Sequence, residues 1–330
     1  MIRIINNSTD PHFNLALEEY ALKHLDIDDS IIILWQNEPS VIIGRNQNTI
    51  EEINNKYIKD NKINVVRRLS GGGTVYHDLG NLNFTFITKR SKENARNFEM
   101  FTKPVIETLQ QFGVPAEFTG RNDISIEGKK FSGNAQYTYQ DKLLHHGTIL
   151  FNSDLAVVQE ALNVKTEKIE SKGIKSVRSR VTNILPYLKE SITLEEFKTI
   201  LAKNMFAHYH QQAKELQLND DDIVIIKKLM DDRYIKWDWN YGESPAFTLQ
   251  KNRRYPGGNL DIRMNVKDGI IEDCKIYGDY FGQMDTKDLT DQMIKLKYEE
   301  SAILTLLEEI DFSQYFTHIS RDEFMDCLFY

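Results

Sequence analysis

The chain has 330 residues, and its 41 lysines and arginines against 49 aspartates and glutamates give a formal net charge of −8. Proteins that bind nucleic acid or an anionic membrane by general charge attraction carry clustered positive charge, so this balance argues against both classes. Hydrophobic residues make up 41% of the chain, which is enough for a buried core, and the length exceeds what one core usually serves. We therefore expect two domains of unequal size.

Neither a membrane segment nor a secretory signal is expected. The apolar runs, such as 31–35 and 223–226, are far too short to span a bilayer. The first residues contain neither the charged region nor the apolar region of a signal peptide, which predicts a cytoplasmic protein. The two cysteines, Cys274 and Cys327, are too few for a disulfide framework or a cysteine-rich metal site.

The chain is expected to begin with a helix and two strands. Asp10 and Pro11 are typical of an N-cap and a first helical position, and apolar residues at helical spacing follow them. Two β-branched runs come next, 31–36 and 41–46, with Glu38 and a proline between them. This pattern predicts two strands joined by a turn.

Three strand signals follow one another between residues 64 and 88, around a run of three glycines. We expect these strands to pair antiparallel, because parallel neighbours need a crossover of a dozen or more residues. A helix over 95–112 should end at Gly113, a typical C-cap residue. Further short strands up to residue 151 predict an α+β fold with a largely antiparallel sheet.

The segment 165–180 carries six basic and two acidic residues and has few apolar positions. No face of it could pack against a core, so it is expected to be a mobile loop. Basic residues also bind nucleic acid, but aromatic residues are absent here and the whole chain is acidic. We therefore favour a loop that closes over the phosphate of a nucleotide.

The second half of the chain is expected to be mostly helical over 152–240, with a capping box at Thr193. Glycine, proline and polar residues then concentrate at 242–256, where we place a linker. Beyond it, an Asp268-Gly269 turn between two strand signals predicts a hairpin, and helical patterns follow. The expected domains are 1–245, with the catalytic site, and 253–330, a small α+β accessory domain.

The most unusual local feature is the run of three glycines, 71–73, which directly follows Arg67, Arg68, Leu69 and Ser70. Glycines between strands cost backbone entropy unless a ligand must approach the main chain closely. A loose hairpin turn is the alternative interpretation. The two arginines favour a ligand, because guanidinium groups pair with phosphate or carboxylate. The run matches neither a Walker A motif nor a dinucleotide fingerprint.

Two charged residues near this point are candidates for a site. Lys130 follows a predicted turn and precedes Ser132-Gly133, where a ligand could come close, while Lys129 is expected to be solvated surface. Asp123 could hold Mg²⁺ or pair with a lysine. Neither residue is decisive alone.

Two histidine motifs carry weaker signals. His145 and His146 should face opposite sides of a strand, one solvated and one hydrogen-bonded inside, and metal binding by the pair is the least favoured interpretation. A catalytic dyad of His77 and Asp78 is not expected, because neighbours on a strand face opposite ways.

Taken together, the motifs resemble those of bacterial lipoate–protein ligases, in the biotin/lipoyl ligase superfamily. The resemblance covers essentially the whole chain, and the joint occurrence of the motifs in this order is highly specific. The matching stretches are FNLALEEY (13–20), LWQNEPSVIIGRNQN (34–48), RRLSGGGTVYHDLGNLNFTFI (67–87), GRNDISIEGKKFSGNAQ (120–136), HHGTILF (145–151), SKGIKSVRSRVTNI (171–184) and WDWNYGESPAF (237–247).

This resemblance implies a catalytic domain with a mainly antiparallel mixed sheet flanked by helices, and a two-step reaction. Lipoate and ATP, with Mg²⁺, would give lipoyl-AMP and pyrophosphate. The lipoyl group would then pass to a lysine of an acceptor domain, in a dehydrogenase complex, in the glycine-cleavage carrier protein or in both. Neither nucleic acid nor a membrane is an expected partner.

The resemblance also implies site residues. Lys130 matches the family lysine that contacts both the acyl carbonyl and the phosphate, and Thr74 stands where many relatives have alanine. The nucleotide would be bound by Arg68, Gly73, Thr74, Val75, Tyr76, Asp123 and Lys130. Lipoate would be bound by Ser70, Gly71, Gly72, Gly73 and Lys130. The adenylate-binding loop would contribute Lys172, Gly173, Ser176, Val177, Arg178 and Arg180, and no metal ligand is assigned.

Elementary electrostatics agrees with the role of Lys130, since a fixed ammonium relieves the repulsion between a carboxylate and the α-phosphate of ATP. Two alternatives remain. An octanoyltransferase of the same superfamily would need a cysteine to carry the acyl chain, but residues 1–273 contain none. A non-catalytic protein that binds lipoyl domains is compatible with the fold alone.

Overall fold

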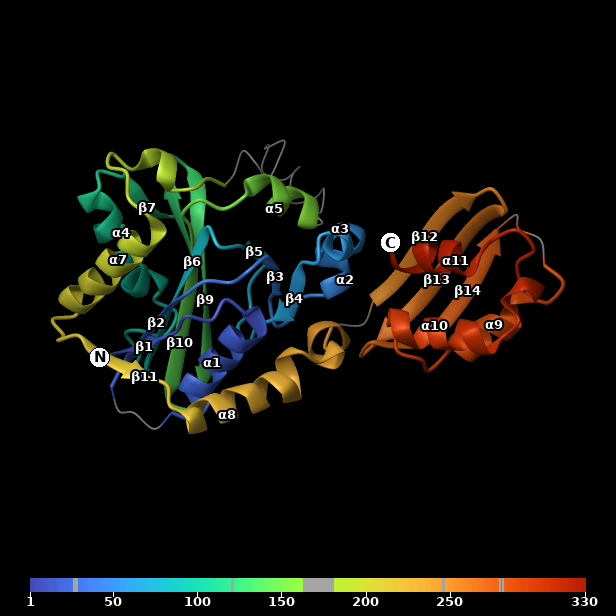
Figure 1. The fold of residues 1–330 in the computed structure, drawn as a ribbon, viewed down its shortest axis with the longest axis horizontal. Coiled ribbons are helices and arrows are strands. Elements are labelled where there is room, and N and C mark those ends of the chain that lie inside the picture. Colours follow the sequence, from blue (N-terminus) through green and yellow to red (C-terminus); the bar gives the residue numbers. More distant parts are fainter. Residues whose placement is uncertain (26–28, 120–121, 163–180, 245–246, 279, 281) are drawn as a thin grey trace. The chain divides into compact units, whose positions relative to one another are not determined.

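A computed structural model describes the whole chain except residues 26–28, 120–121, 163–180, 245–246, 279 and 281. It divides into two compact units, the first made of 1–45 and 62–236 and the second of 46–61 and 237–330. In Figure 1, where the colours follow the sequence, the residues of each unit can be traced. The sequence placed 46–61 with the first domain, whereas the contacts group it with the second unit. The functional limits 1–245 and 253–330 stay a prediction.

The first unit is built on an eight-stranded mixed sheet. Its strands are antiparallel to their neighbours except at one edge, where β11, β1 and β2 run parallel, so the expected α+β fold with a mainly antiparallel mixed sheet is confirmed. In spatial order the strands are β11 (Lys214–Gln217), β1 (Ile2–Ile5), β2 (Ile31–Trp35), β6 (Asn81–Lys89), β10 (Lys142–Leu150), β9 (Lys129–Tyr139), β8 (Asp123–Ile126) and β7 (Ala116–Thr119).

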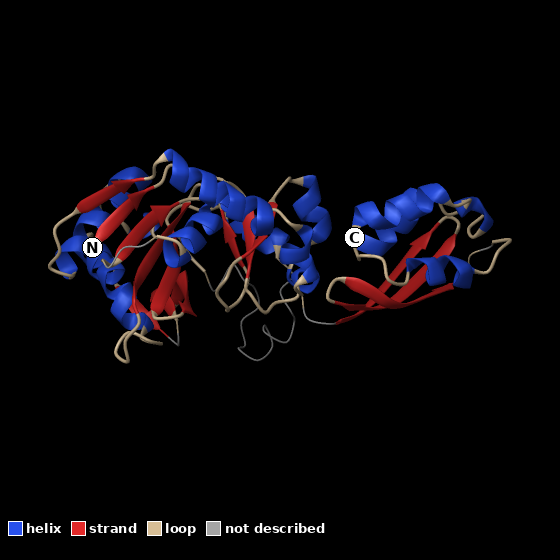
Figure 2. Ribbon diagram, turned by 90° about the horizontal axis from the view of Figure 1, so that it is seen from below, coloured by secondary structure: helices blue, strands red, loops and turns tan. Residues whose placement is uncertain are grey.

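Helices cover both faces of this sheet (Figures 1 and 2). On one face, α4 (Phe98–Gln111) and α7 (Leu194–His208) pack against Phe84 and Phe86 of β6 to form the main hydrophobic core. On the other face lies α1 (Pro11–Lys23), which in turn packs against α8 (Asp220–Leu229). Because side chains alternate along a strand, β6 turns Asn83 and Thr85 toward the α1 face. The two faces of one strand therefore serve the core and a polar region.

Local signals placed two of the helix starts correctly. Asp10 accepts hydrogen bonds from the main-chain N–H groups of His12 and Phe13, and Pro11 is the first helical residue, as predicted. The capping box at Thr193 is also confirmed. The predicted helix 95–112 corresponds to α4, which begins later, after the N-cap Asn97, and Gly113 follows it with φ of +73°.

The pairing of the strands around the glycine run was predicted wrongly. A second, three-stranded sheet has β3 (Ser40–Ile43) between β4 (Asn64–Arg67) and β5 (Val75–His77). Strand β3 is parallel to β4 and antiparallel to β5, while β6 belongs to the large sheet. The crossover that a parallel pair requires is present, because α2 (Thr49–Glu52) and α3 (Asn55–Asp60) lie between β3 and β4.

The remainder of the first unit is mostly helical, as predicted. It contains α5 (Leu155–Ala161), the 3-10 helix η2 (Leu185–Tyr187) and the π-helical turn η3 (Met230–Tyr234), but also the unpredicted β11. The predicted loop 165–180 lies outside the described residues. Within the described residues, no helix has the length and hydropathy needed to cross a lipid bilayer.

The second unit contains a three-stranded antiparallel sheet and covering helices (Figure 2). The predicted hairpin is confirmed, with Asp268 and Gly269 at positive φ between two strands. The predicted linker 242–256 is wrong, because this stretch contains β12, an edge strand whose polar, partly exposed side chains lack hydrophobic alternation. The elements are η4 (Asp238–Gly242), β12 (Phe247–Tyr255), β13 (Gly258–Lys267), β14 (Ile270–Gly278), α9 (Thr286–Met293), α10 (Glu300–Glu309), η5 (Phe312–Gln314) and α11 (Arg321–Phe329).

His145 and His146 face opposite sides of β10, as predicted, but neither is solvated. His145 is fully buried in the core, where its ring stacks on Phe101 with 4.7 Å between the ring centroids. His146 is 9% exposed on the α1 face. Burial, followed by the neighbouring His146, holds the pKa of His145 well below its ordinary value of 6.5.

We predict that His145 makes the fold sensitive to acid. The unfolded chain binds a proton at this histidine below about pH 6.5 whereas the folded chain does not, so the free energy of unfolding falls by about 1.4 kcal/mol per pH unit from this group. The change His145→Phe should weaken the dependence, as measured by urea unfolding at about pH 7.5 and about pH 5.5. An equal loss of stability in both proteins would contradict this.

Candidate functional site

The first unit contains a cavity of about 110 Å³ on the α1 face of the large sheet. Its wall includes six of the residues that the sequence assigned to the site: Arg68, Gly72, Gly73, Thr74, Val75 and Lys130. Further wall residues come from α1, β2, β3, β6 and β10, among them Leu15, Trp35, Ile42, Asn83 and His146. The cavity therefore joins an apolar region to a group of polar and charged side chains.

The glycine run forms a loop that Arg68 holds from inside. The buried guanidinium donates through Nη2 to the carbonyl oxygens of Gly71 (2.7 Å) and Gly73 (2.8 Å), and through Nε to Ser70 Oγ (3.0 Å). Its Nη1 donates to the carbonyl oxygen of Ile42 (3.1 Å). Burial lowers the pKa of Arg68 to about 10, so the group stays charged at neutral pH. Arg68 thus shapes the loop from within.

These contacts orient the main chain of the loop. In a trans peptide the carbonyl and the next N–H point in opposite directions. Because the carbonyls of Gly71 and Gly73 face Arg68, the N–H groups of Gly72 and Thr74 point to the other side of the loop. Such N–H groups are typical ligands for an anion. Gly72 has φ of +96°, which a side chain would strain.

Lys130 is placed by an irregularity in β9. Ile124 pairs with Ser132 and Ser125 pairs with Lys130, so Phe131 is an extra residue, a β-bulge. Phe131 is buried in the core, and Lys130 lies on the same side as Gly133. A Cβ atom at Gly133 would be 2.9 Å from Lys130 Nζ. The bulge and the missing side chain at position 133 together give the lysine its position.

The ammonium of Lys130 forms an ion pair with Asp123, with 2.7 Å between Nζ and Oδ1. Both side chains remain more than a third exposed, so a ligand can reach them. The carbonyl oxygen of Lys130 accepts a hydrogen bond from the N–H of Thr182 (2.9 Å), which lies in the stretch 171–184 that matches the adenylate-binding loop. Of the two roles that the sequence left open for Asp123, binding of Mg²⁺ and pairing with a lysine, the structure shows the pairing.

A buried chain of hydrogen bonds links the apolar region to the glycine loop. Trp35 Nε1 donates to Thr85 Oγ1 (2.9 Å), and Thr85 Oγ1 donates to Glu18 Oε1 (2.5 Å). His146 lies between Glu18 and Ser70, with Nδ1 3.0 Å from Glu18 Oε1 and Nε2 2.6 Å from Ser70 Oγ. Sequence reasoning missed Glu18. The sequence does contain one indication of its role: Glu18 is a carboxylate on the apolar face of an amphipathic helix, between Leu15 and Leu22.

Several residues that the sequence assigned to the site do not form part of the cavity wall. Tyr76 is buried in β5 but is absent from the cavity wall, because Val75 and His77 take the cavity-facing positions of this strand. Ser70 and Gly71 lie behind the wall, in contact with Arg68. The loop residues Lys172, Gly173, Ser176, Val177, Arg178 and Arg180 lie outside the described residues.

Both cysteines are poor nucleophiles, and the described residues contain no metal cluster. Cys274 and Cys327 are buried in the second unit, and burial raises the pKa of Cys274 to about 12 and that of Cys327 to about 11. Across the part of the chain that the structure describes, no three histidine, cysteine or acidic side chains gather in a way that could hold a metal ion. The site therefore offers a cation and main-chain donors, and neither cysteine is part of the cavity wall.

Comparison with known proteins gives consistent matches. Residues 10–206 match the model of the lipoyl protein ligase A/B catalytic domain, and residues 244–328 match that of the bacterial lipoate protein ligase C-terminus. The chain is 49% identical to lipoate-protein ligase LplJ of Bacillus subtilis over 98% of both chains.

Two solved structures are also similar. One is the bipartite lipoate protein ligase of an archaeal lipoylation system, studied with its E2 lipoyl domain, from Thermoplasma acidophilum (TM-score 0.66, 28% identity, 73% of this chain and 96% of that chain). The other is lipoate-protein ligase A bound with ATP (TM-score 0.65, 25% identity, 73% and 98%).

We predict that two adjacent glycines of the loop differ in their effect on stability. Gly72→Ala should lower the free energy of unfolding by about 1–3 kcal/mol, because it strains a left-handed residue and places Cβ 3.0 Å from Arg68 Nη2. Gly73→Ala should change it by less than about 0.5 kcal/mol, because its Cβ would meet no atom within 4 Å. Urea unfolding measures both. Equal losses in the free energy of unfolding for the two variants would contradict the loop conformation described here.

Proposed function

The chain belongs to the family of bacterial lipoate–protein ligases, and from this premise we propose how its residues perform the two-step reaction. Lipoate and ATP combine to give lipoyl-AMP and pyrophosphate, and the lipoyl group then passes to a lysine of an acceptor protein. The observation that carries this assignment is the position of Lys130, whose ammonium lies beside the glycine loop in the wall of one cavity.

In the first step a carboxylate oxygen of lipoate attacks the α-phosphorus of ATP, and the bond from that phosphorus to the bridging oxygen of pyrophosphate breaks. The two reacting groups are both anions and repel each other. Lys130 would lie between them and stabilise the charge that develops on their oxygens. Asp123 orients the ammonium while no substrate is bound, since the pair is only 2.7 Å apart and partly exposed.

In the second step the ε-amine of the acceptor lysine attacks the acyl carbon, the bond to the phosphate oxygen breaks, and AMP leaves as the amine loses a proton. Lys130 remains beside the acyl oxygen and stabilises its negative charge. This step needs no protein nucleophile, in agreement with two cysteines that are buried and whose pKa values are raised. An octanoyltransferase mechanism through cysteine is therefore disfavoured.

The glycine loop would bind the adenylate through its main chain. We assign Gly73, Thr74 and Val75 to the nucleotide, with Tyr76 contributing through its main chain only. Ser70, Gly71 and Gly72 would shape the end that holds the lipoate carboxylate, and Arg68 would act through the loop that it supports. The apolar wall residues Leu15 and Trp35 suit the acyl chain, at roughly 0.8 kcal/mol per buried CH₂.

Mg²⁺ is part of the proposal as a partner of ATP. Asp123 could contribute one carboxylate oxygen, and the absence of a three-ligand cluster among the described residues agrees with a metal held mainly by phosphates and water. When bound, Mg²⁺ neutralises phosphate charge. The remaining electrostatic stabilisation comes from Lys130 and the main-chain N–H groups.

The acceptors would be lipoyl domains of dehydrogenase complexes, the glycine-cleavage carrier protein or both. The similarity to a ligase that was studied with its E2 lipoyl domain supports an acceptor of this kind. The predicted adenylate-binding loop, including Lys172 and Arg178, would close over the nucleotide. A cytoplasmic location, where ATP is available, completes the proposal.

We predict that Lys130→Ala abolishes most of the lipoate-dependent exchange between ATP and pyrophosphate. Loss of one preorganised charged donor typically lowers the rate about 100-fold to 1000-fold. The variant should unfold like the wild type, because an exposed ion pair contributes at most about 1 kcal/mol.

Lys129→Ala is the matched control, since Lys129 is the exposed neighbour and should retain full exchange. Near wild-type exchange by the Lys130 variant would refute its assigned role. A wild-type protein without any exchange would indicate a binding protein in place of an enzyme.

We further predict that Gly73→Ala raises the KM for ATP at least about tenfold while stability is unchanged. The added methyl group would meet no protein atom within 4 Å but would occupy the space of the nucleotide. Steady-state kinetics with a fixed lipoate concentration measures this. An unchanged KM would place the nucleotide away from Gly73.

A further inference from the structure

We propose that Glu18 is a positioning residue for the glycine loop. Its carboxylate fixes the tautomer of His146, and His146 in turn holds the hydroxyl group of Ser70, which directly precedes the three glycines. The inference rests on the proposed function, because it assumes that this loop binds the adenylate. It deepens that function by giving a role in the first step to a carboxylate of α1 that is not part of the cavity wall.

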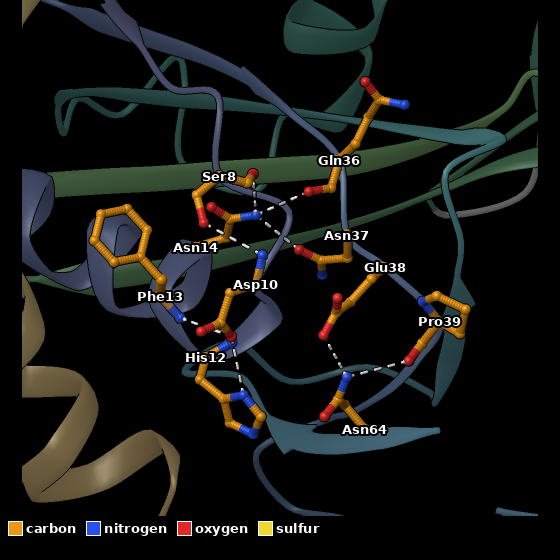
Figure 3. A network of polar contacts seen from close by, with 10 residues as sticks. All are labelled: Ser8, Asp10, His12, Phe13, Asn14, Gln36, Asn37, Glu38, Pro39 and Asn64. Atoms are coloured by element: carbon orange, nitrogen blue, oxygen red, sulfur yellow. Dashed lines mark hydrogen bonds and ion pairs between the residues drawn. The ribbon is translucent and has the colours of Figure 1, made fainter. Parts of the chain in front are cut away.

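The start of α1 is held in place by a polar network (Figure 3). The amide nitrogen of Asn14 donates to the carbonyl oxygens of Ser8 (3.0 Å) and Gln36 (2.8 Å). The same nitrogen donates to Oδ1 of Asn37 (2.9 Å). Glu18 is one helical turn beyond Asn14 and therefore lies on the same side of α1. The network thus fixes the helix face from which Glu18 projects.

The carboxylate of Glu18 is buried, with only 3% of the residue exposed. Burying a carboxylate is costly unless its oxygens accept hydrogen bonds. Trp35 Nε1 can only donate, so Thr85 Oγ1 accepts from it and donates its own proton to Glu18 Oε1 (2.5 Å). The two carboxylate oxygens lie 3.0 and 3.1 Å from His146 Nδ1. Glu18 therefore faces a hydroxyl donor on one side and an imidazole on the other.

The loop end of this chain of hydrogen bonds determines the tautomer of the imidazole. Arg68 Nε can only donate, so Ser70 Oγ accepts from it (3.0 Å) and keeps its own proton for another acceptor. That acceptor is His146 Nε2, 2.6 Å away. A ring nitrogen that accepts carries no proton, so neutral His146 carries its proton on Nδ1 and donates it to Glu18. Donors thus reach Glu18 from both sides, and only an acceptor fits there.

An amide at position 18 would reverse the second half of the chain. The amide oxygen would keep the hydrogen bond from Thr85, so the amide nitrogen would face His146 Nδ1 and donate to it. The ring proton would move to Nε2, which would then donate to Ser70 Oγ. The hydroxyl proton of Ser70 would lose its acceptor, and water could not replace it, because Ser70 is only 1% exposed. The glycine loop would lose one of the contacts that hold it.

The order Glu18, His146, Ser70 is also that of a catalytic triad. A nucleophilic serine has to reach the carbon that it attacks, but Ser70 is buried and is absent from the cavity wall. Its oxygen also accepts a hydrogen bond from Arg68, which holds the loop from inside. The three residues are therefore arranged to hold the loop, and Ser70 does not attack a substrate.

The effect of Glu18 on the reaction should be on the rate of adenylation. The N–H groups of Gly72 and Thr74 stabilise developing charge well only if they are oriented before the reaction begins. A looser loop therefore lowers kcat, whereas a lost contact with the acyl chain would raise the KM for lipoate. The two parameters separate a role in the loop from a role in acyl binding.

The test measures lipoate-dependent exchange between ATP and pyrophosphate by the full chain. Glu18→Gln should lower kcat about tenfold and leave the KM for lipoate within about twofold of the wild-type value. In a Ser70→Ala background the same change should lower kcat by less than about twofold, because the hydroxyl through which Glu18 acts is gone. A purely structural role of Glu18 would lower kcat by the same factor in both backgrounds.

Glu19→Gln is the matched control. Glu19 is the adjacent carboxylate of α1 and is 2% exposed, but its partners are Lys23, Arg233 and Tyr234. It should keep the wild-type kcat and KM. An equal loss of kcat in this variant would indicate a general effect of α1 and would overturn the inference.

The tautomer of His146 is the second measurement, and it keeps the inference testable if Glu18→Gln fails to fold. In ¹⁵N-histidine-labelled wild-type protein at neutral pH, the ring proton of His146 should be on Nδ1, and Nε2 should be unprotonated. A proton on Nε2 would contradict the order of the chain.

Two further results would overturn the inference: an unchanged kcat in Glu18→Gln, or a raised KM for lipoate without a loss of kcat. If the wild type forms lipoyl-AMP, the proposed function stands in all of these cases. A wild type that forms no lipoyl-AMP would instead overturn the proposed function, while the tautomer of His146 would still report whether Glu18 orders the chain.

Discussion

In the proposed mechanism, the repulsion between a carboxylate and a triphosphate is the constraint on which the site depends. We propose that the two groups meet at the ammonium of Lys130, which forms an ion pair with Asp123 at 2.7 Å. The lysine cannot reach this place from a regular strand, because strict alternation would put Phe131 in its position. A β-bulge sends Phe131 into the core, and Gly133 leaves the space that Nζ occupies. Packing and chemistry therefore depend on the same irregularity.

The large sheet separates stability from function through its two faces. On β10, His145 stacks on Phe101 in the core while its neighbour His146 contacts Glu18 and Ser70 on the α1 face. Strand β6 shows the same arrangement, because Phe84 packs in the core while its neighbour Thr85 donates a hydrogen bond to Glu18 on the α1 face. The polar face can thus hold a chain of hydrogen bonds from Trp35 to the glycine loop without disturbing the hydrophobic core. A loop that is held by hydrogen bonds to Arg68 is suited to electrostatic catalysis, since donors that are already oriented need little reorganisation.

Much of the fold could be predicted from the sequence wherever the signal is local. The caps at Asp10 and Thr193 and the turn at Asp268-Gly269 depend on a few adjacent residues. The pairing of β3 with both β4 and β5 could not be predicted from the sequence. It depends on a crossover whose two short helices show no strong helical spacing of hydrophobic residues. Strand β12 was missed for a related reason, since an edge strand with polar side chains resembles a linker.

In the candidate site, too, the residues in local motifs could be predicted, whereas those defined by contacts between distant segments could not. Lys130, Asp123 and the glycines follow from motifs, and the structure brings Lys130 and Asp123 into contact. Glu18 and His77 were missed because their surroundings arise only when distant segments meet: Glu18 contacts His146 of β10, and His77 contacts Asn37. Tyr76 was assigned by its place in a motif, but strand alternation turns it away from the cavity.

A crystal structure with a non-hydrolysable analogue of lipoyl-AMP would test the central claim most directly. The account predicts that Lys130 Nζ leaves Asp123 and lies about 2.7–3.2 Å from both the acyl oxygen and the oxygen that replaces the phosphate oxygen. A lysine that points into bulk solvent, while other groups contact those two oxygens, would contradict it.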